Sequence, residues 1–377
     1  MIKIAIAGDF VATNRVKLYA EKHQYKEIFG ETKAKFQDFD YRIVNLESPI
    51  AAEDAKPIIK CGPSLKCDEN AINLLIYGGF DCATLANNHF YDYGDIGVET
   101  TLKVLDQHQI DHVGGGRNLE EASEILYKQI QGEVIAFINC CEHEFSIATP
   151  NTGGSNPISP IRQYHAILEA RKKAKYVIVI THGGIEGYAY PTPQMQEAYR
   201  FFIEIGADAV VNHHQHCPCG YEIFHGKPIF YGLGNFCFDP LQSKDKSWHE
   251  GFIVGIFFDE DKVSFELNPY LQNYDQLGVK YLDDDACLVF LEKIKQFNSV
   301  NNNPIQLAEA YEKYIEDISI YLKSLFTPYS KKWSKALYSK GLLPFYYPKE
   351  KWPFVLNNVE CESLRDRLIN FIKKQIH

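Results

Sequence analysis

The stretch MIKIAIAGDF, residues 1–10, combines a short apolar run with an acidic residue, Asp9, near its end. Such a run, bounded by Gly and Asp, predicts a buried β-strand over residues 2–7. The run is too short for the apolar core of a signal peptide, and it lacks a small-residue cleavage site. We therefore expect a strand of the core to begin almost at the first residue.

The same pattern continues outward to about residue 235, where short apolar strands alternate with helical segments. Alternation at this spacing indicates an α/β fold with helices packed on a largely buried sheet. Residues 252–258 and 262–268 predict a hairpin, because only a short polar stretch separates them. The other predicted strands are 42–45, 81–85, 134–139, 176–181, 209–212 and 228–231, and the predicted helices are 69–77, 96–108, 161–173 and 194–205.

Beyond about residue 280 the apolar periodicity is helical, and it predicts helices over residues 284–296, 304–325 and 360–374. We therefore expect a body of residues 1–270 and a mainly helical C-terminal subdomain of residues 271–377. A role of this subdomain as a lid over the functional site is a hypothesis, which its removal by limited proteolysis would test.

Composition excludes several classes of protein. The 377 residues are 45% hydrophobic, which excludes intrinsic disorder, and no apolar run reaches the length of about 18 residues that a membrane span needs. With 39 Lys and Arg against 49 Asp and Glu, the net charge of −10 disfavours general nucleic-acid binding. The ten scattered cysteines, without an export signal, are expected to be free thiols, and we predict a cytoplasmic protein.

Polar side chains gather where the predicted strands end, which is where open α/β sheets place their ligand sites. His214 and His216 follow one such strand. In an extended segment, residues two apart point to the same side, so these imidazoles could grip one metal or two adjacent ones. For this pair alone, a merely polar loop is an equal alternative. The other strand-end residues of interest are Asp9, Glu47, Asn88, His89 and His182.

Together these side chains offer carboxylate oxygens, an amide oxygen and imidazole nitrogens. Mixed nitrogen and oxygen ligands on separate strand ends suit a two-metal hydrolytic centre, with Zn, Mn or Fe as the ion. N-capping or turn formation would explain Asp9 or Asn88 individually. The joint occurrence of six such residues favours the metal centre: Asp9, Glu47, Asn88, His182, His214 and His216.

Seven short motifs follow one another along the chain. They are GD at 8–9, NLESP at 45–49, LANNHFYDYG at 85–94, GGGRNLEEA at 114–122, THGGIEGY at 181–188, HHQH at 213–216 and KPIFYGLGNFCFD at 227–239. In this order they resemble the bacterial CapA-type poly-γ-glutamate capsule synthesis proteins, of the calcineurin-like metallophosphoesterase superfamily. The resemblance covers roughly residues 1–240, and the tail beyond about residue 270 carries none of it.

The resemblance implies a four-layer sandwich of two mixed β-sheets flanked by helices, with a C-terminal helical extension. It also implies a dinuclear metal site at the strand ends, in which His89 is the catalytic residue that protonates the leaving group. An imidazole acting as general acid beside a metal-activated water agrees with this chemistry. The residues that fall on the metal-binding positions are Asp9, Glu47, Asn88, His182, His214 and His216.

Two departures from the superfamily pattern bear on the number of metals. The usual first motif is Asp-x-His, but Phe10 and Val11 follow Asp9 here, so one ligand is missing. Glu47 stands where an Asp is typical of the wider superfamily. One metal and two metals therefore both stay open. Members of the family are commonly membrane-anchored, and we expect this chain to lack an anchor.

Five further residues are candidates for substrate binding, although each is a surface residue by default. Guanidinium groups suit phosphate or carboxylate, which favours Arg15 and Arg117. Cys217 and Cys219 are too few for a structural zinc site, and the glycine run at 114–116 predicts a turn. The remaining candidates are Glu186, Tyr188 and Asn235.

The sequence thus predicts a metal-dependent hydrolase that cleaves a phosphoester, or a related bond, by metal-activated water. Its expected partners are a small anionic or polymer-derived substrate and enzymes of capsule synthesis. Two alternatives stay open, namely hydrolysis of γ-glutamyl amide bonds and a non-catalytic accessory role in polymer synthesis. The intact set of histidines favours catalysis over an accessory role.

Overall fold

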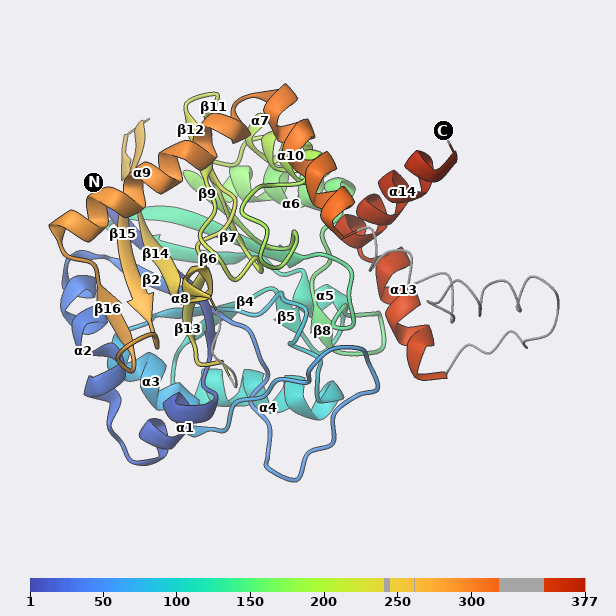
Figure 1. Cartoon of the computed structure of the whole chain (residues 1–377). Helices are drawn as coiled ribbons and strands as arrows, with labels where there is room; N and C mark the ends of the chain where they lie inside the picture. The colour runs from blue at the N-terminus through green and yellow to red at the C-terminus, as the bar shows by residue number, and fades with distance from the viewer. Residues whose placement is uncertain (241–244, 261, 319–348, 377) are drawn as a thin grey trace.

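The computed structural model describes residues 1–240, 245–260, 262–318 and 349–376. Two β-sheets stack at the centre of the molecule, and helices cover their outer faces (Figure 1). Within the described residues, the first sheet has the strand order β16-β15-β14-β1-β2-β3-β4, and β13 also pairs with β1. Its strands are β1 (Ile2–Val11), β2 (Tyr41–Leu46), β3 (Cys82–Thr84), β4 (Asp111–Val113), β13 (Asn235–Phe238), β14 (Glu250–Asp259), β15 (Lys262–Gln272) and β16 (Val279–Tyr281).

The second sheet has the order β11-β12-β10-β9-β7-β6. Both sheets are mixed, since β1 is parallel to β2 but antiparallel to β14, and β7 is parallel to β9 but antiparallel to β6. A small ribbon pairs β5 (Gly115–Gly116) with β8 (Gly154–Ser155). The strands of the second sheet are β6 (Leu126–Ile130), β7 (Glu133–Cys141), β9 (Tyr176–His182), β10 (Ala209–His213), β11 (Tyr221–Phe224) and β12 (Lys227–Phe230).

The alternation of side chains along β1 shows how the layers form. Ile4 and Ile6 belong to the core between the two sheets, whereas Ala5 and Ala7 belong to the core under the helices. Successive residues of a strand point to opposite faces, so an almost wholly apolar strand has to be covered on both sides. This explains why the N-terminal stretch is apolar without interruption.

Helices complete the outer layers. On the first sheet, Val16, Ile28 and Leu102 share one core with the strands, and on the second sheet Ile167 and Phe202 do the same. The order helix, sheet, sheet, helix confirms the predicted four-layer sandwich. The helices are α1 (Asn14–Glu21), α2 (Tyr25–Lys35), α3 (Asn70–Gly78) and α4 (Gly94–Gln107) on the first sheet, α6 (Pro160–Lys173) and α7 (Pro193–Glu204) on the second, and the short α5 (Leu119–Ala122) and α8 (Lys246–His249).

The C-terminal part is helical, but its first helix packs with the body. Phe290 and Ile294 of α9 (Asp284–Asn301) lie in the core between the sheets. The predicted boundary at residue 270 falls inside β15, and β16 continues the first sheet beyond it. The predicted helix 304–325 is observed as α10 (Pro304–Asp317), and its last residues lie outside the described ones. The tail ends with α13 (Trp352–Glu360) and α14 (Glu362–Ile376).

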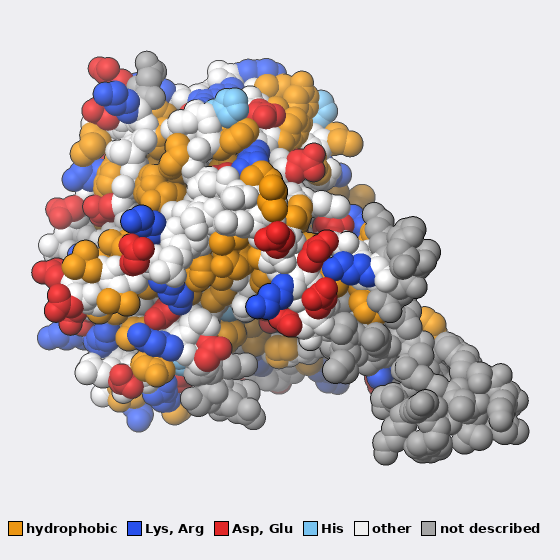
Figure 2. Space-filling view, turned by 45° about the horizontal axis from the view of Figure 1, so that its top comes forward, with side chains coloured by type: hydrophobic (Ala, Val, Ile, Leu, Met, Phe, Trp, Pro, Cys, Tyr) orange, Lys and Arg blue, Asp and Glu red, His pale blue; other side chains and the backbone are white. Residues whose placement is uncertain are grey.

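The surface and the thiols agree with the composition. On the face shown in Figure 2, Lys and Arg side chains are interspersed with Asp and Glu. All ten cysteines are free, as predicted, and eight of them are buried. Each helix in the described ranges is too short or too polar to cross a lipid bilayer.

Candidate metal centre

The predicted ligands converge where strands of both sheets end. Asp9 lies near the end of β1, and Glu47 comes directly after β2 of the same sheet. His182 is the last residue of β9, and His214 follows β10, in the second sheet. Because the carboxyl ends of parallel strands meet at this edge, side chains distant in sequence come together there. The six that do so are all buried: Asp9, Glu47, Asn88, His182, His214 and His216.

Glu47 lies at the centre of these side chains. Its Oε1 is 3.5 Å from Nε2 of His182 and 3.6 Å from Nε2 of His216. His182 Nε2 is in turn 3.0 Å from Oδ1 of Asn88 and 3.1 Å from Nδ1 of His214. Imidazoles from the end of β9 and from the segment after β10 therefore face one carboxylate.

The contacts form two groups of three residues that have Glu47 in common. Within each group, the potential ligand atoms all lie within 4.8 Å of one another. One group offers two imidazoles and a carboxylate, and the other offers one imidazole and two carboxylates. A shared carboxylate between two such groups is an arrangement that can hold two neighbouring cations. The groups are Glu47, His182 and His214, and Asp9, Glu47 and His216.

The carboxylate of Glu47 lacks hydrogen bonds within the described part of the protein. The side chain is fully buried, and among the described residues neither of its oxygens has a hydrogen-bond partner. Burial raises the pKa of Glu47 well above its ordinary value. A buried carboxylate without hydrogen bonds is costly unless a cation lies next to it. The residues present therefore fit a bound metal ion.

The second group of ligands shows the same need for positive charge. Burial acts to lower the pKa of His216, but Glu47 and Asp9 outweigh burial and raise the pKa to about 10. Burial acts to raise the pKa of Asp9, but the hydrogen bond from His216 and the nearby histidines hold it below its ordinary value. A proton on His216 thus supplies the charge that a cation would supply. Metal binding has to displace it, since a ligating imidazole is neutral.

The other two histidines are already in the form that binds a metal. Burial lowers the pKa of His214 to about 4, and it lowers the pKa of His182 well below the ordinary value, with repulsion from His214 adding to it. At neutral pH both rings are therefore neutral, and a neutral imidazole is the form that ligates metals.

The backbone of the HHQH segment differs from the prediction. β10 ends at His213, and His214 and His216 have φ angles of 96° and 56°. The segment is not extended. The prediction that the two rings lie together because side chains alternate along a strand was therefore wrong in its reason. Instead, two residues with positive φ turn the chain so that both rings reach the site, a strained backbone that is common at functional sites. His213 joins the two sheets, because its Nε2 lies 3.0 Å from the carbonyl oxygen of Ala7.

The glycine before Asp9 is required by close strand packing. A Cβ at Gly8 would lie 1.9 Å from the carbonyl oxygen of Gly234, whose own φ is +80°. At this point the pairing of β1 with β2 shifts between Ala7 and Asp9. Such irregularities re-aim a side chain near active sites. The GD motif and the GLGN turn are thus two sides of one contact that positions Asp9.

We expect Gly8→Ala to lower the free energy of unfolding by about 3 kcal/mol, because two backbones would have to separate. Gly132→Ala is the matched control. Gly132 has a φ of +87°, but nothing lies within 4 Å of its added Cβ, so only the local strain of about 1 kcal/mol applies. Urea unfolding of both variants measures the difference, and equal losses would show that the contact with Gly234 is unimportant.

Two asparagines orient the candidate ligands. Asn45 Nδ2 donates to Oδ1 of Asp9 at 2.7 Å and lies 3.2 Å from Nδ1 of His182. Asn235 Oδ1 is 2.9 Å from Nδ1 of His216, so that Nε2 is the ring nitrogen on the side of Glu47. An acceptor at the second ring nitrogen, as Asn235 provides for His216, fixes the ring and tautomer of a metal-binding histidine. Asn235 thus contacts a histidine. Asn45, which follows a predicted strand and begins the NLESP motif, had been assigned no role in the site.

His89 belongs to a buried charged cluster. Its Nδ1 lies 2.7 Å from Oδ2 of Asp92 and 3.1 Å from Nζ of Lys60, and Lys60 pairs with the other oxygen of Asp92. Burial lowers the pKa of His89, and Lys60 adds to the effect while Asp92 opposes it. Neither partner was predicted. For Asp92 the available signal was its position three residues after His89 in LANNHFYDYG.

A cavity of about 330 Å³ lies beside these groups. Asn88, His89 and His214 line it, so the candidate ligands and the candidate proton donor share one space. Glu186, predicted to bind substrate, also lines it. A further lining residue was not predicted: Glu144 has its Oε1 3.8 Å from Nε2 of His214, and burial raises its pKa to about 7.

The sequence model of the family described as bacterial capsule synthesis protein PGA_cap matches residues 3–240. The chain belongs to this family. The capsule biosynthesis protein CapA of Bacillus anthracis is 29% identical to it over 253 residues, which are 65% of this chain and 62% of that protein. The PGA biosynthesis protein CapA of Bacillus subtilis (strain 168) is 30% identical over 243 residues, 63% of this chain and 64% of that protein.

The match to either CapA protein thus spans less than two thirds of that relative's length. A solved structure of a 5'-nucleotidase precursor from Thermus thermophilus superposes with a TM-score of 0.44 at 11% identity. That superposition covers 78% of this chain and 58% of the other.

Three predicted substrate-binding residues of this PGA_cap member have other partners. Arg15 binds the carboxylate of Asp239 with Nε and Nη2, and Arg117 pairs with a glutamate four residues further on. Tyr188 packs against Tyr314 of α10, with 4.7 Å between the ring centroids. None of the three is among the described residues that line the cavity. The geometry therefore gives them structural contacts and lends no support to substrate binding.

Proposed function

We propose that this member of the PGA_cap family is a metal-dependent hydrolase that cleaves a phosphoester in the metabolism of a capsule polymer. The observation that carries the proposal is the buried carboxylate of Glu47, which lacks a hydrogen-bond partner among the described residues and lies between two groups of histidine and acidic side chains. A cation is the group that best satisfies such a carboxylate. The connection with a capsule polymer rests on family membership.

The proposed cofactor is a pair of divalent cations, Zn, Mn or Fe, since these ions accept mixed nitrogen and oxygen ligands. Glu47, which the two groups have in common, would help to hold both cations, with Asn88 as a further oxygen ligand beside His182. Val11, which stands at the histidine position of the Asp-x-His pattern, is apolar and buried in the core, so it does not replace the absent ligand. Cations bound here would lower the pKa of a water molecule and polarise the scissile bond.

The remaining chemistry is assigned to this chain's own residues. His89 would donate a proton from Nε2 to the leaving oxygen, because Asp92 holds the other ring nitrogen. Asp92 would keep the ring in place and stabilise its protonated form, in the way a carboxylate orients a catalytic histidine. Lys60, which pairs with Asp92, would prevent that carboxylate from becoming an uncompensated buried charge.

Metal analysis combined with hydrolysis of an aryl phosphate monoester and a diester tests the proposal. We expect the purified protein to bind Mn or Zn and to hydrolyse at least one of these substrates. His214→Ala should lose the metal bound by one of the two ligand groups. Its kcat/KM should fall by at least about 100-fold. His165→Ala is the matched control, since His165 is an exposed histidine of α6, and it should retain both properties.

Two other results would replace the proposal. Absence of bound metal, with no activity after addition of Mn or Zn, would exclude the hydrolase and leave the non-catalytic accessory role. Metal binding with turnover of γ-glutamyl amides alone would favour the amide hydrolase.

A further inference from the structure

The cavity beside the candidate metal centre has walls from two parts of the chain. Lys60, His89 and His214 come from the part that matches the PGA_cap family, residues 3–240. Asn357 of α13 and Arg367 of α14 come from the C-terminal tail. The family match alone therefore does not account for the whole cavity.

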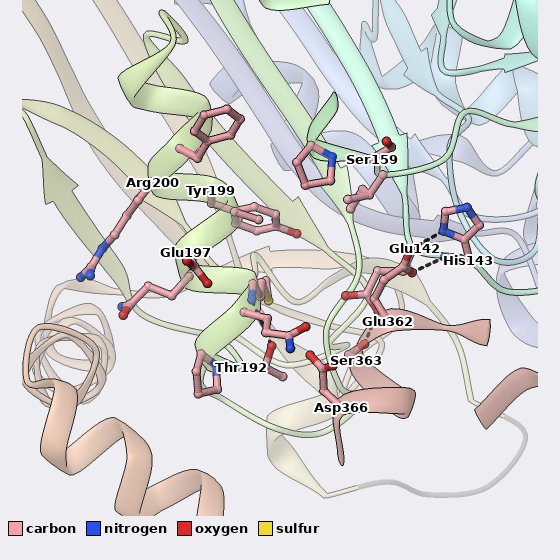
Figure 3. Close-up of a pocket in the computed structure, with 18 of the residues that line it drawn as sticks. Glu142, His143, Ser159, Thr192, Glu197, Tyr199, Arg200, Glu362, Ser363 and Asp366 are labelled. Atoms are coloured by element: carbon pink, nitrogen blue, oxygen red, sulfur yellow. Dashed lines mark hydrogen bonds and ion pairs between the residues drawn. The ribbon is translucent and has the colours of Figure 1, made fainter. Parts of the chain in front are cut away.

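Polar contacts fasten the tail next to the site. Figure 3 shows Glu362 and Ser363, at the start of α14, beside Glu142 and His143, which follow β7. The carboxylate of Glu362 accepts a hydrogen bond from the backbone N–H of His143 at 3.0 Å and pairs with its ring. Ser363 Oγ bonds to Glu142 and to the carbonyl oxygen of Gly184, the latter at 3.0 Å.

An apolar cluster completes this attachment. Ile185 and Tyr188 of the body pack with Ile315 of α10 and with Leu368 and Phe371 of α14. Ile185 follows His182 by three residues, so the cluster lies close to a candidate ligand in the sequence. Because the attachment is both polar and apolar, the wall that the tail adds to the cavity is a fixed part of it.

Arg367 is a buried, hydrogen-bonded part of that wall. Its side chain is buried, with 7% of the residue exposed, and it lines the cavity. Nη1 donates to the hydroxyl of Tyr314 and Nη2 donates to Oδ1 of Asn358, both at 3.2 Å, which fixes the plane of the guanidinium. A guanidinium fixed in this way suits recognition of a carboxylate or phosphate.

Asn357 gives a second, independent indication of a ligand. It lines the same cavity with 9% of the residue exposed, and its Oδ1 is buried without a hydrogen-bond partner among the described residues. Buried polar atoms in folded proteins are nearly always paired, so an unpaired one on a residue that lines a cavity is consistent with a bound group that donates to it.

We propose that Arg367 binds an oxyanion of the substrate, carboxylate or phosphate, at a subsite that the C-terminal tail adds to the metal centre. Asn357 accepts a hydrogen bond from a neighbouring donor of the same ligand. The reaction itself rests on the proposed function, whereas binding of the oxyanion does not. A cavity of about 330 Å³ is near the lower limit for small-molecule pockets, so the substrate is a small molecule or the end of a polymer chain.

Arg367 brings a positive charge to a cavity that also has acidic side chains in its walls. Glu144 and Glu186 line the cavity and repel an anionic ligand, and Lys60 is engaged by Asp92. Removal of the guanidinium charge should therefore weaken binding of an oxyanion by about 10- to 100-fold, the range of one charge-assisted hydrogen-bonded contact.

Two measurements on the chain of 377 residues test the proposal. Calorimetric titration of the metal-free protein with inorganic phosphate and with glutarate separates the two oxyanion sources without any turnover. Steady-state kinetics with the Mn-loaded protein then compares KM and kcat. Arg367→Gln removes the charge, Arg367→Lys keeps it without the planar fork, and Arg365→Gln is the control, since Arg365 is exposed on the same helix and does not line this cavity.

We expect Arg367→Gln to bind one or both oxyanions at least about 10-fold more weakly and to raise KM with kcat within about twofold, with Arg367→Lys intermediate and Arg365→Gln unchanged. Weaker oxyanion binding in a protein that hydrolyses nothing would sustain this inference and reject the proposed function. Equal binding by wild type and Arg367→Gln, or no detectable binding to the wild type, would overturn the inference. An active enzyme whose KM is unchanged by Arg367→Gln would overturn it while the proposed function stands. Thermal unfolding of each variant shows whether it is folded. If Arg367→Gln does not fold, Arg367→Lys is compared with the wild type instead.

Discussion

Glu47→Gln should abolish metal binding to both ligand groups and lower the rate of hydrolysis by at least about 10³-fold, which corresponds to about 4 kcal/mol of transition-state stabilisation. The reason is that Glu47 is the residue that the two groups have in common. A neutral amide of almost the same shape retains the packing but offers one oxygen without charge. Among the described residues of the two groups, no other single substitution removes a ligand from both at once.

The same substitution should stabilise the metal-free protein. Without metal, the wild type buries a carboxylate whose oxygens have no hydrogen-bond partner among the described residues, and burial raises its pKa because ionisation is unfavourable there. Glu47→Gln removes this charge, while the protonated His216 keeps Asp9 as its counter-ion, 3.5 Å from Nδ1. The free energy of unfolding of the variant in the presence of a chelator should therefore exceed that of the wild type by about 1 kcal/mol or more. Addition of Mn or Zn should stabilise the wild type through binding and leave the variant unchanged.

Chemical unfolding of both proteins, with chelator and with metal, tests whether the variant is the more stable protein without metal and the wild type is the more stable one with metal. His165→Ala, which changes an exposed histidine of α6, serves as the control and should follow the wild type in both conditions. Destabilisation of Glu47→Gln by the same amount with and without metal would show that Glu47 is a structural residue and would remove the main support for the metal centre.

The strands could be predicted as far as they depend on local apolar runs, and their ends could not. The run at residues 2–7 predicts a strand, but β1 continues to Val11 because β13, far along the chain, pairs with its last residues. The first two helices, α1 and α2, were not predicted from the sequence. α1 buries only Val16 and Ala20, and with so few apolar residues its helical period is hard to see in the sequence.

The convergence of the candidate metal ligands could be predicted because they lie at or beyond the ends of strands, and parallel strands bring their ends to one edge of a sheet. Lys60 could not be predicted in this way, since it lies in an irregular segment between β2 and α3 that only the fold places beside His89. Arg367 is further still from any motif. Its place in the cavity depends on how α14 packs against Ile185 and Tyr188, which no local pattern specifies.

His89→Asn should lower kcat by about 10²- to 10⁴-fold for substrates with a poor leaving group, and much less for an aryl phosphate with a good one. The proposed role of His89 is to protonate the leaving oxygen, and an acidic phenol leaves without that help. Asn retains an N–H that can donate to Oδ2 of Asp92, 2.7 Å from Nδ1 of the histidine, but it lacks a counterpart of Nε2. The substitution therefore removes the proton donor and keeps the contact that holds it.

Rates for a series of alkyl and aryl phosphates with different leaving-group pKa values measure this effect. In His89→Asn the rate should fall more steeply with leaving-group pKa than in the wild type, while bound metal, determined by elemental analysis, stays the same. Asp92→Asn should show a smaller loss in the same direction, because it affects only the position and protonation of the ring. If His89→Asn slowed all substrates by one common factor, or lost metal, His89 would act on substrate or metal binding. The donor would then have to be sought among the other groups that line the cavity, of which Glu144, with a pKa raised to about 7 by burial, is protonated in part at neutral pH.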